Sequence, residues 1–165
     1  MTRTDVTNAS PLISLARAGA LDLLLDPEAD LLIPEPVASE VLAGPAADPA
    51  RQALERGWGR RIPVEVLRPA VLEWSLGRGE SAVLTLAADR PGSVAILDDA
   101  AARRCARALG IPVMGTLGVV LRARRAGRIP SAGRVLRDLR GAGLHLDNEV
   151  IRHALATVAG ETWDG

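Results

Sequence analysis

The sequence of 165 residues contains no phenylalanine, no tyrosine and no lysine, and it has a single cysteine. Without Phe and Tyr, the core of a domain this long must be built from Leu, Val, Ile and Ala, and 48% of the residues are hydrophobic. One cysteine excludes a disulfide framework and a cysteine-based zinc site. No apolar run approaches membrane-spanning length, and the N-terminus does not resemble a signal peptide. We therefore expect a soluble, cytoplasmic protein without a membrane partner.

An excess of charge of either sign is also lacking. Twenty arginines balance twenty Asp and Glu residues, so the formal net charge is zero. This balance argues against a strongly basic coat for nonspecific nucleic-acid binding, but it allows a local basic patch. With three tryptophans as the only aromatic side chains, base stacking can contribute little to the capture of single strands. His145 and His153 lack metal-site spacing and are interpreted as surface or helix-end residues.

The most informative stretch begins with a short apolar run, residues 94–97, and turns into a helix-forming run at Ala100, with Asp98 and Asp99 at the junction. This pattern predicts a buried parallel strand that leads into a helix, and ligands bind at such strand ends in open α/β sheets. Two adjacent carboxylates repel each other unless a proton, an arginine or a cation neutralises them, which favours a divalent metal. The alternative is that one of them only caps the helix.

Strands and helices alternate along the rest of the chain, which predicts one α/β domain with a mostly parallel sheet. Strands are expected at residues 5–8, 31–33, 62–66 and 111–114, in addition to 94–97. The strand at 62–66 is expected at an edge of the sheet because it contains proline. Two more helices, 131–140 and 147–158, are predicted in the C-terminal third.

Two further acids accompany apolar helix stripes. Glu40 follows Val37 by three residues, on the stripe that also holds Val41, and an acid that faces a core needs a partner or a metal. Glu80 precedes Val83 on the apolar face of a second helix. Its alternative interpretation is stabilisation of the helix dipole by an acid in the first turn.

The apolar residues from Leu12 to Leu25 do not fit on one narrow helix face. Part of this surface is therefore predicted to meet a partner or another subunit. The alternative is that two short helices pack on both sides within the chain.

The order and spacing of these features resemble the PIN-domain superfamily, and within it a branch of nucleic-acid-binding PIN-like proteins related to the VapC-type toxins. The matching phrases are residues 8–13, 33–41, 77–80, 97–103 and 115–118. The resemblance implies a three-layer α/β/α sandwich with a central, mostly parallel sheet and a C-terminal helical extension. It implies a single PIN-like domain over residues 1–165, divided into a PIN core (1–127), C-terminal helices (128–160) and a mobile tail (161–165).

The resemblance also implies a metal-dependent nuclease, usually acting on RNA, with Mg²⁺ or Mn²⁺ held by carboxylates. Carried over by position, the metal ligands would be Asn8, Glu40, Glu80, Asp98 and Asp99, of which the four acids would be catalytic. Ser10 and Thr116 match supporting positions. Asn8 stands where most relatives have an aspartate, so one ligand oxygen remains, one charge is lost, and affinity for a divalent ion should fall.

Physical chemistry agrees with this site. Hydrolysis of a phosphodiester needs an activated water and neutralisation of developing charge, and a divalent ion among carboxylates supplies both. Oxygen ligands suit Mg²⁺ or Mn²⁺ rather than zinc. Arginines near the acids are predicted to hold the phosphates of RNA. These are Arg78, Arg103 and Arg104, and the track is expected to continue through Arg122, Arg124 and Arg125.

The expected function is a metal-dependent endoribonuclease, the toxin of a toxin-antitoxin pair. In relatives the groove formed by the N-terminal helices receives the antitoxin, and the apolar Leu12 to Leu25 surface would fit such a groove. Relatives also form homodimers. The alternative is a PIN-like module that binds nucleic acid or a protein without cutting, its metal site decayed at Asn8. A third possibility is a nuclease for DNA or structured RNA. The sequence identifies neither the cut site nor the antitoxin.

Overall fold

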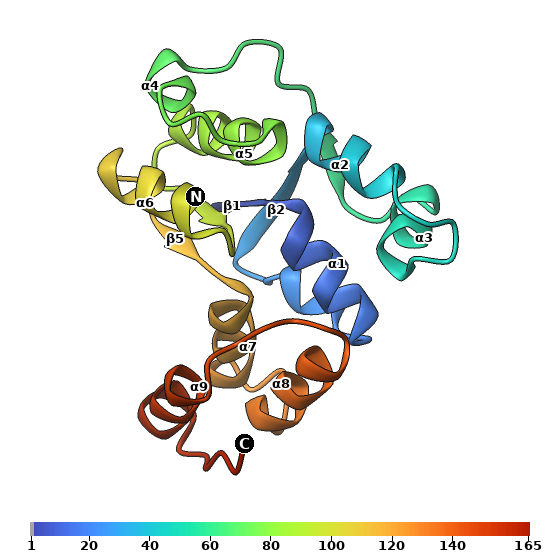
Figure 1. The fold of residues 1–165 in the computed structure, drawn as a ribbon, viewed down its shortest axis with the longest axis vertical. Helices are drawn as coiled ribbons and strands as arrows, with labels where there is room; N and C mark the ends of the chain where they lie inside the picture. Colours follow the sequence, from blue (N-terminus) through green and yellow to red (C-terminus); the bar gives the residue numbers. More distant parts are fainter. Residues whose placement is uncertain (1) are drawn as a thin grey trace.

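The computed structural model describes residues 2–165, in which five parallel strands form one sheet between layers of helices (Figure 1). In chain order the elements are β1 (Arg3–Thr7), α1 (Ala9–Arg17), the 3₁₀ helix η1 (Leu21–Leu24), β2 (Ala29–Pro34), α2 (Glu35–Leu42), α3 (Pro49–Glu55), β3 (Arg60–Ile62), α4 (Pro69–Leu72), α5 (Arg78–Ala88), β4 (Val94–Ile96), α6 (Ala100–Ala108), β5 (Val113–Met114), α7 (Thr116–Arg125), α8 (Ala132–Gly141), α9 (Asn148–Ala154) and the π-helical turn η2 (Leu155–Ala159).

The strand order of the sheet is β3-β2-β1-β4-β5, and every neighbouring pair is parallel. The chain therefore builds outward from β1 in one direction and then returns to its other side through β4. In the register, Val6 of β1 lies beside Leu32 of β2, and Thr7 lies beside Ile96 of β4. The crevice between the carboxyl ends of β1 and β4 is the switch point of the sheet, where ligands bind in folds of this kind.

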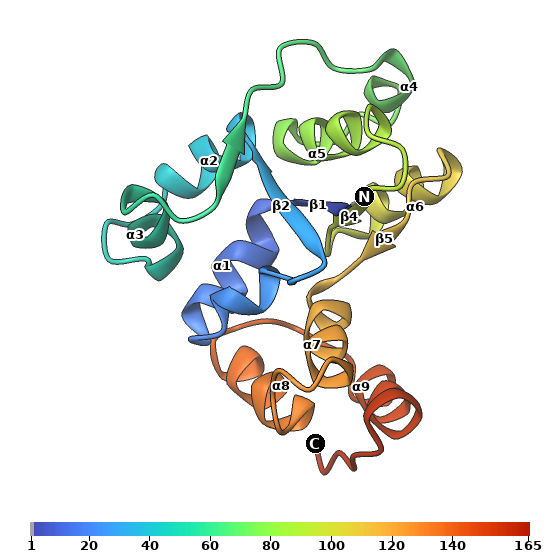
Figure 2. The same cartoon turned by 180° about the vertical axis from the view of Figure 1, so that it is seen from behind.

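Helices cover both faces of the sheet, as right-handed crossovers require. On one face α1 packs against α2 and α3, and on the other α5 packs against β1, β2, β4 and α6. Figures 1 and 2 show α7, α8 and α9 gathered at one end of the molecule and α4 with α5 at the other. The predicted three-layer α/β/α sandwich is confirmed, with a sheet that is parallel throughout. Within residues 2–165, no helix is both long and apolar enough to cross a bilayer.

The edge strand differs in position from its prediction. The prediction spans residues 62–66, whereas β3 covers Arg60–Ile62 and lies at the edge beside β2. Pro63 follows immediately and has no N–H for the ladder, so pairing stops where the prediction has the strand begin. The short helix α4 was not predicted, because four residues are too few to show a helical period.

The apolar residues from Leu12 to Leu25 are mostly used inside the chain. Leu12, Leu15 and Leu24 are almost fully buried, and α1 contacts α2, α3 and α8. Leu25 is the large hydrophobic side chain of this stretch that is exposed, at 41%. The alternative of two short helices packed on both sides describes α1 and η1. Most of this apolar surface is therefore packed within the chain, and the antitoxin surface stays a prediction.

The residues that were expected to form a mobile tail make specific contacts. The Glu161 carboxylate accepts hydrogen bonds from Ser131 Oγ (2.7 Å) and from the backbone N–H of Ala132 (2.9 Å) at the start of α8. Trp163 is 4% exposed, and its indole N–H donates to Asn148 Oδ1 (3.1 Å). The guanidinium of Arg140 lies over its ring, 5.2 Å from the centroid. These contacts join residues 161–163 to α8 and α9, and no local sequence pattern indicates them.

Glu161→Gln is expected to destabilise the fold at neutral pH by about 1–2 kcal/mol, since a charged acceptor at a helix N-terminus becomes neutral. Burial by itself raises the pKa of Glu161, but the hydrogen bonds from Ser131, Ala132 and Gly133 outweigh it and lower the pKa. The contribution is therefore present above the unfolded pKa and is lost as the pH falls through the folded one. Urea unfolding at pH 7 and at about pH 3 should show a difference that closes on acidification.

Asp164→Asn removes a charge from an exposed neighbour and serves as the control. Equal midpoints for Glu161→Gln and the parent at pH 7 would show that the carboxylate does not anchor the end of the chain.

Candidate metal centre

Three predicted site residues follow the carboxyl ends of adjacent strands. Asn8 directly follows β1, Asp98 comes two residues after β4, and Thr116 begins α7 just beyond β5. Because the strands are parallel, these ends meet at one edge of the sheet. Glu40, in α2, and Glu80, in the first turn of α5, come from helices on opposite faces that touch each other.

The amide oxygen of Asn8 is buried without a partner. Asn8 occupies the N-cap of α1, where asparagine usually accepts a backbone N–H, but its side chain makes no capping bond. Its Oδ1 is buried and accepts no hydrogen bond from residues 2–165, and the residue is 5% exposed. A buried acceptor without a donor is uncommon and indicates a water or ion at that point.

The space in front of Asn8 is kept open by a glycine. A Cβ atom at Gly79 would lie 3.1 Å from Asn8 Oδ1 and 3.2 Å from Glu40 Oε2. The two oxygens therefore face the same small gap beside the first turn of α5. A side chain at position 79 would fill this gap, which makes it a cradle lined by oxygens.

Glu40 and Glu80 line a common hollow of about 540 Å³. Partial burial of the Glu40 carboxyl raises its pKa, and the neighbouring negative charge of Glu80 raises it further. The prediction that Glu40 faces the core is wrong, because its side chain is exposed while Val37 and Val41 are buried. At about 100° per residue, Glu40 and Val41 lie on opposite sides of Val37, so that Glu40 falls at the border of the stripe.

The adjacent aspartates have separate roles in the structure. Asp98 Oδ1 accepts the N–H of Thr116 (2.8 Å), and its Oδ2 accepts the hydroxyls of Thr116 (2.6 Å) and Ser10 (3.3 Å). Asp99 is exposed, and its Oδ2 accepts the N–H of Ala102 (2.9 Å) as the N-cap of α6. Asp99 therefore caps α6, whereas Asp98 is held by Thr116 and Ser10, and the metal-binding role of either aspartate stays a prediction.

The predicted ligands form two neighbouring groups. Within residues 2–165, no three Asp, Glu, His or Cys side chains lie close enough together to hold an ion. Glu40 and Glu80 form one group, and Asp98 with its hydroxyl partners forms the other. Asn8 lies between the two groups, since its backbone N–H donates to Ile96 of β4 (3.0 Å), two residues before Asp98, while its Oδ1 borders the same gap at Gly79 as Glu40.

The residues fit a hard divalent cation by their chemistry. An unpartnered amide oxygen, a cradle that a Cβ would fill, and two carboxylates that repel each other all favour a positive charge at this place. Sequence reasoning missed Gly79, because the short Gly-Arg-Gly stretch before Glu80 does not match a phosphate loop. The available signal was a glycine at the start of a helix, next to a candidate ligand.

The arginines that were predicted to bind phosphates fall into two groups, those that line a hollow and those that form ion pairs. Arg78 is exposed and lines the hollow of Glu40 and Glu80, and Arg103 and Arg104 line a second hollow beside Asp98. The extension of this track through α7 is wrong for two residues. Arg122 pairs with Asp5 and Asp26, and Arg124 pairs with Glu161, so both are engaged in holding the fold.

Comparison with known families supports the resemblance. A family model described as a PIN domain matches residues 4–160, which is nearly the whole chain. No curated protein matches the chain. PIN domains are generally nucleases and typically use divalent metals. The fold and the extent of this match lead to one conclusion: the chain belongs to the PIN-domain family.

Proposed function

We propose that this chain is a divalent-metal-dependent endoribonuclease that hydrolyses RNA phosphodiester bonds. The observation that carries the proposal is the buried, unpartnered Oδ1 of Asn8, which shares the Gly79 cradle with Glu40 at the switch point of the sheet. A fold of the nuclease type and a set of hard oxygen donors at its ligand-binding edge support the same function.

Asn8, Glu40 and Glu80 would hold Mg²⁺ or Mn²⁺. Asp98 lies just after β4, the strand next to β1. A bound ion would stabilise the charge that develops on the phosphate and make water easier to deprotonate. Ser10 and Thr116 fix the rotamer of Asp98 through the three hydrogen bonds that its carboxylate accepts. Asp98 is thereby held just beyond the end of β4, where its carboxylate could accept a proton or a hydrogen bond from water.

Arginines on both sides of the acids would hold the substrate. Arg78 lines the hollow of Glu40 and Glu80, and Arg103 lines the hollow beside Asp98. Guanidinium groups bind phosphates in a bidentate manner. An RNA chain whose phosphates bind at both places would run across the carboxyl ends of the β-strands. This placement favours RNA, or another phosphodiester strand, over a small uncharged substrate.

The proposal predicts that Mn²⁺ stabilises the parent but not Glu40→Gln. Saturation at about 100 times the dissociation constant adds about 2.7 kcal/mol, which should raise the unfolding midpoint of a domain this size by about 5–10 °C. In EDTA the variant should be at least as stable as the parent, since the substitution removes repulsion with Glu80. The measurements are thermal unfolding and cleavage of a mixed RNA pool, each in Mg²⁺, Mn²⁺ and EDTA.

Glu28→Gln is the matched control, because Glu28 is exposed and lies just before β2, at the amino ends of the strands. It should keep both the metal-induced shift and the cleavage. A metal-induced shift in Glu40→Gln as large as that of the parent would remove Glu40 from the ligand set.

Two observations favour a second candidate function. Asn8 carries no charge, and no three Asp, Glu, His or Cys side chains are grouped closely enough to hold an ion in residues 2–165. A PIN-like module that binds RNA without cutting it is the corresponding alternative. RNA binding with neither cleavage nor a metal-induced shift would select this alternative. We keep the toxin role, with its antitoxin and homodimer, as a proposal about cellular context, without assigning the antitoxin to the Leu12 to Leu25 surface.

A further inference from the structure

The start of α5 carries a second glycine, Gly77, whose presence the backbone conformation does not explain. Gly77 is the N-cap of the helix, with φ −59° and ψ 160°, a conformation that is open to any residue. Glycine is favoured where φ is positive, as at Gly110, but not here. Asparagine, aspartate and serine stabilise an N-cap more than glycine does, because their side chains accept a backbone N–H. The reason for glycine at position 77 must therefore lie in the space beside it.

That space is filled by the carboxylate of Glu80. A Cβ atom at position 77 would overlap Glu80 Oε2 and would lie 3.4 Å from Glu80 Cδ. The Glu80 side chain therefore folds back over the N-cap, toward the end of the helix where backbone N–H groups lack partners and a negative charge is favoured. Glu40 lines the same hollow, so this position keeps both carboxylates at one site.

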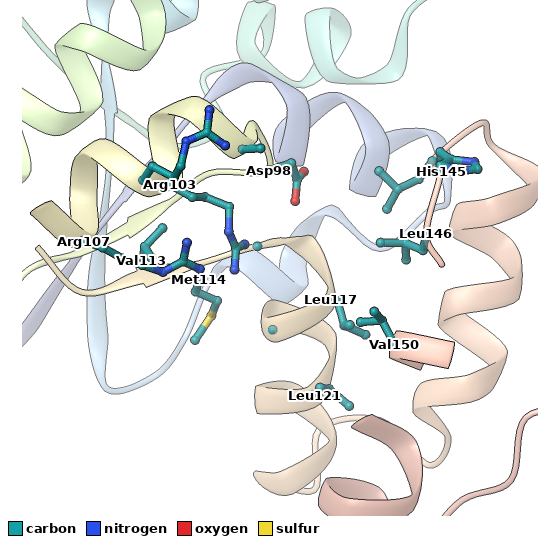
Figure 3. Close-up of a pocket in the computed structure, with 15 residues that line it drawn as sticks. Asp98, Arg103, Arg107, Val113, Met114, Leu117, Leu121, His145, Leu146 and Val150 are labelled. Carbon is teal, nitrogen blue, oxygen red and sulfur yellow. The ribbon is translucent and has the colours of Figure 1, made fainter. Parts of the chain in front are cut away.

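Glu80 and Asp98 are held in different ways. The Asp98 carboxylate accepts three hydrogen bonds from Thr116 and Ser10, and Figure 3 shows it among the residues of the second hollow. Glu80 forms no ion pair with any of residues 2–165. Its side chain can turn, and the space at Gly77 decides which position the carboxylate can take. A change at position 77 should therefore act on Glu80 and leave Asp98 undisturbed.

We infer that Gly77 is a positioning residue for Glu80, because the missing side chain leaves room for the carboxylate in the hollow that it shares with Glu40, where it can serve as an ion ligand. This inference rests on the proposed metal-dependent function and adds a determinant of ion affinity that does not itself touch the ion. Gly77 and Gly79 then have different roles. Gly79 keeps the gap beside Asn8 and Glu40 open, whereas Gly77 leaves room for a ligand.

Gly77→Ala is expected to lower the affinity for Mn²⁺ about tenfold, as the loss of a residue that orients a metal ligand does. Affinity is measured on the purified protein without RNA, by electron paramagnetic resonance of the free Mn²⁺. Because the effect acts through Glu80, Gly77→Ala should cause no further loss in a Glu80→Gln background. Gly79→Ala should lower the affinity in both backgrounds, because its Cβ would crowd Asn8 and Glu40.

Gly77→Ser separates the positioning of Glu80 from the stability of the helix. Serine adds the same Cβ atom as alanine but is a better N-cap, so the two variants should differ in their unfolding midpoints in EDTA and lose Mn²⁺ affinity alike. Gly141→Ala is the matched control, since Gly141 is exposed at the end of α8 and a Cβ atom there would meet nothing within 4 Å. It should bind Mn²⁺ as the parent does.

Three results would overturn the inference. Equal Mn²⁺ affinity in Gly77→Ala and the parent would show that Glu80 does not need this space. An equal loss with and without Glu80→Gln would show that alanine disturbs the helix end itself. The third result is an unmoved Glu80 carboxylate in crystal structures of the parent and Gly77→Ala grown in EDTA, which report its position without metal. A parent that binds no Mn²⁺ would overturn the metal-dependent function as well, so the two failures are distinguishable.

Discussion

Asp98→Asn is expected to reduce metal-dependent RNA cleavage on the order of 10²- to 10⁴-fold, the range that a positioned acid or base supplies. Asp98 is the predicted acid whose two carboxylate oxygens are both held toward the cleft, by Thr116 and Ser10. Asparagine keeps its size but replaces one oxygen with an NH₂ group. That group cannot accept a hydrogen bond from Thr116 or Ser10 and cannot bind a cation, so the negative charge and one possible ligand oxygen are lost.

Asp99→Asn is the matched control for this prediction. It removes the same charge one residue further along, but asparagine is also a good N-cap and can still accept the N–H of Ala102. We expect it to keep cleavage and stability close to those of the parent. Cleavage is measured as initial rates on one RNA at fixed Mn²⁺, with unfolding midpoints for all three proteins. A loss in Asp99→Asn as large as that in Asp98→Asn would return Asp99 to the ligand set.

Asp5→Ala is expected to destabilise the protein by about 3–5 kcal/mol, as the loss of one partner from a buried ion pair does. Asp5 is 0% exposed in β1 and binds Arg3 Nε (3.0 Å) and Arg122 Nη1 (2.8 Å), the latter from α7. Arg122 already has one buried nitrogen, Nη2, without a hydrogen-bond partner among residues 2–165. Without Asp5 the guanidinium would lose its closest counter-charge and keep only Asp26.

Asp89→Ala provides the comparison, since it breaks the Arg68–Asp89 pair, in which both side chains are about half exposed. Exposed pairs contribute about 0–1 kcal/mol, so urea midpoints should differ clearly between the two variants. The double variant Asp5→Leu with Arg122→Met should recover much of the loss, because it removes both charges together. Equal midpoints for Asp5→Ala and Asp89→Ala would show that the buried pair has no special role.

Local patterns predicted the part of the site that depends on strand ends. Asn8 and Asp98 each follow a short strand, and a parallel sheet brings the carboxyl ends of neighbouring strands together. The division of labour between Asp98 and Asp99 could not be predicted. It depends on Thr116 and Ser10, which reach Asp98 from distant parts of the sequence and hold it in the cleft.

Charge pairing over long distances limits what the sequence shows. Arg122 was assigned to a phosphate track because it belongs to an arginine-rich helix, but it pairs with Asp5, 117 residues away. Conversely, the arginines of α6 lie in an equally basic segment and form no ion pair with residues 2–165. The difference between a structural and a substrate-binding arginine lies in the acids that the fold brings near it.

The contacts of Trp163 have a consequence for the order in which the parts of the chain fold during its synthesis. Its indole binds Asn148, to which Arg140 also donates (2.7 Å), two residues from Leu146 and Val150 in the wall of the hollow beside Asp98. On the ribosome, residues 161–163 emerge after the sheet, and N-terminal parts fold first. The sheet and its acids can therefore assemble while this wall still lacks its support.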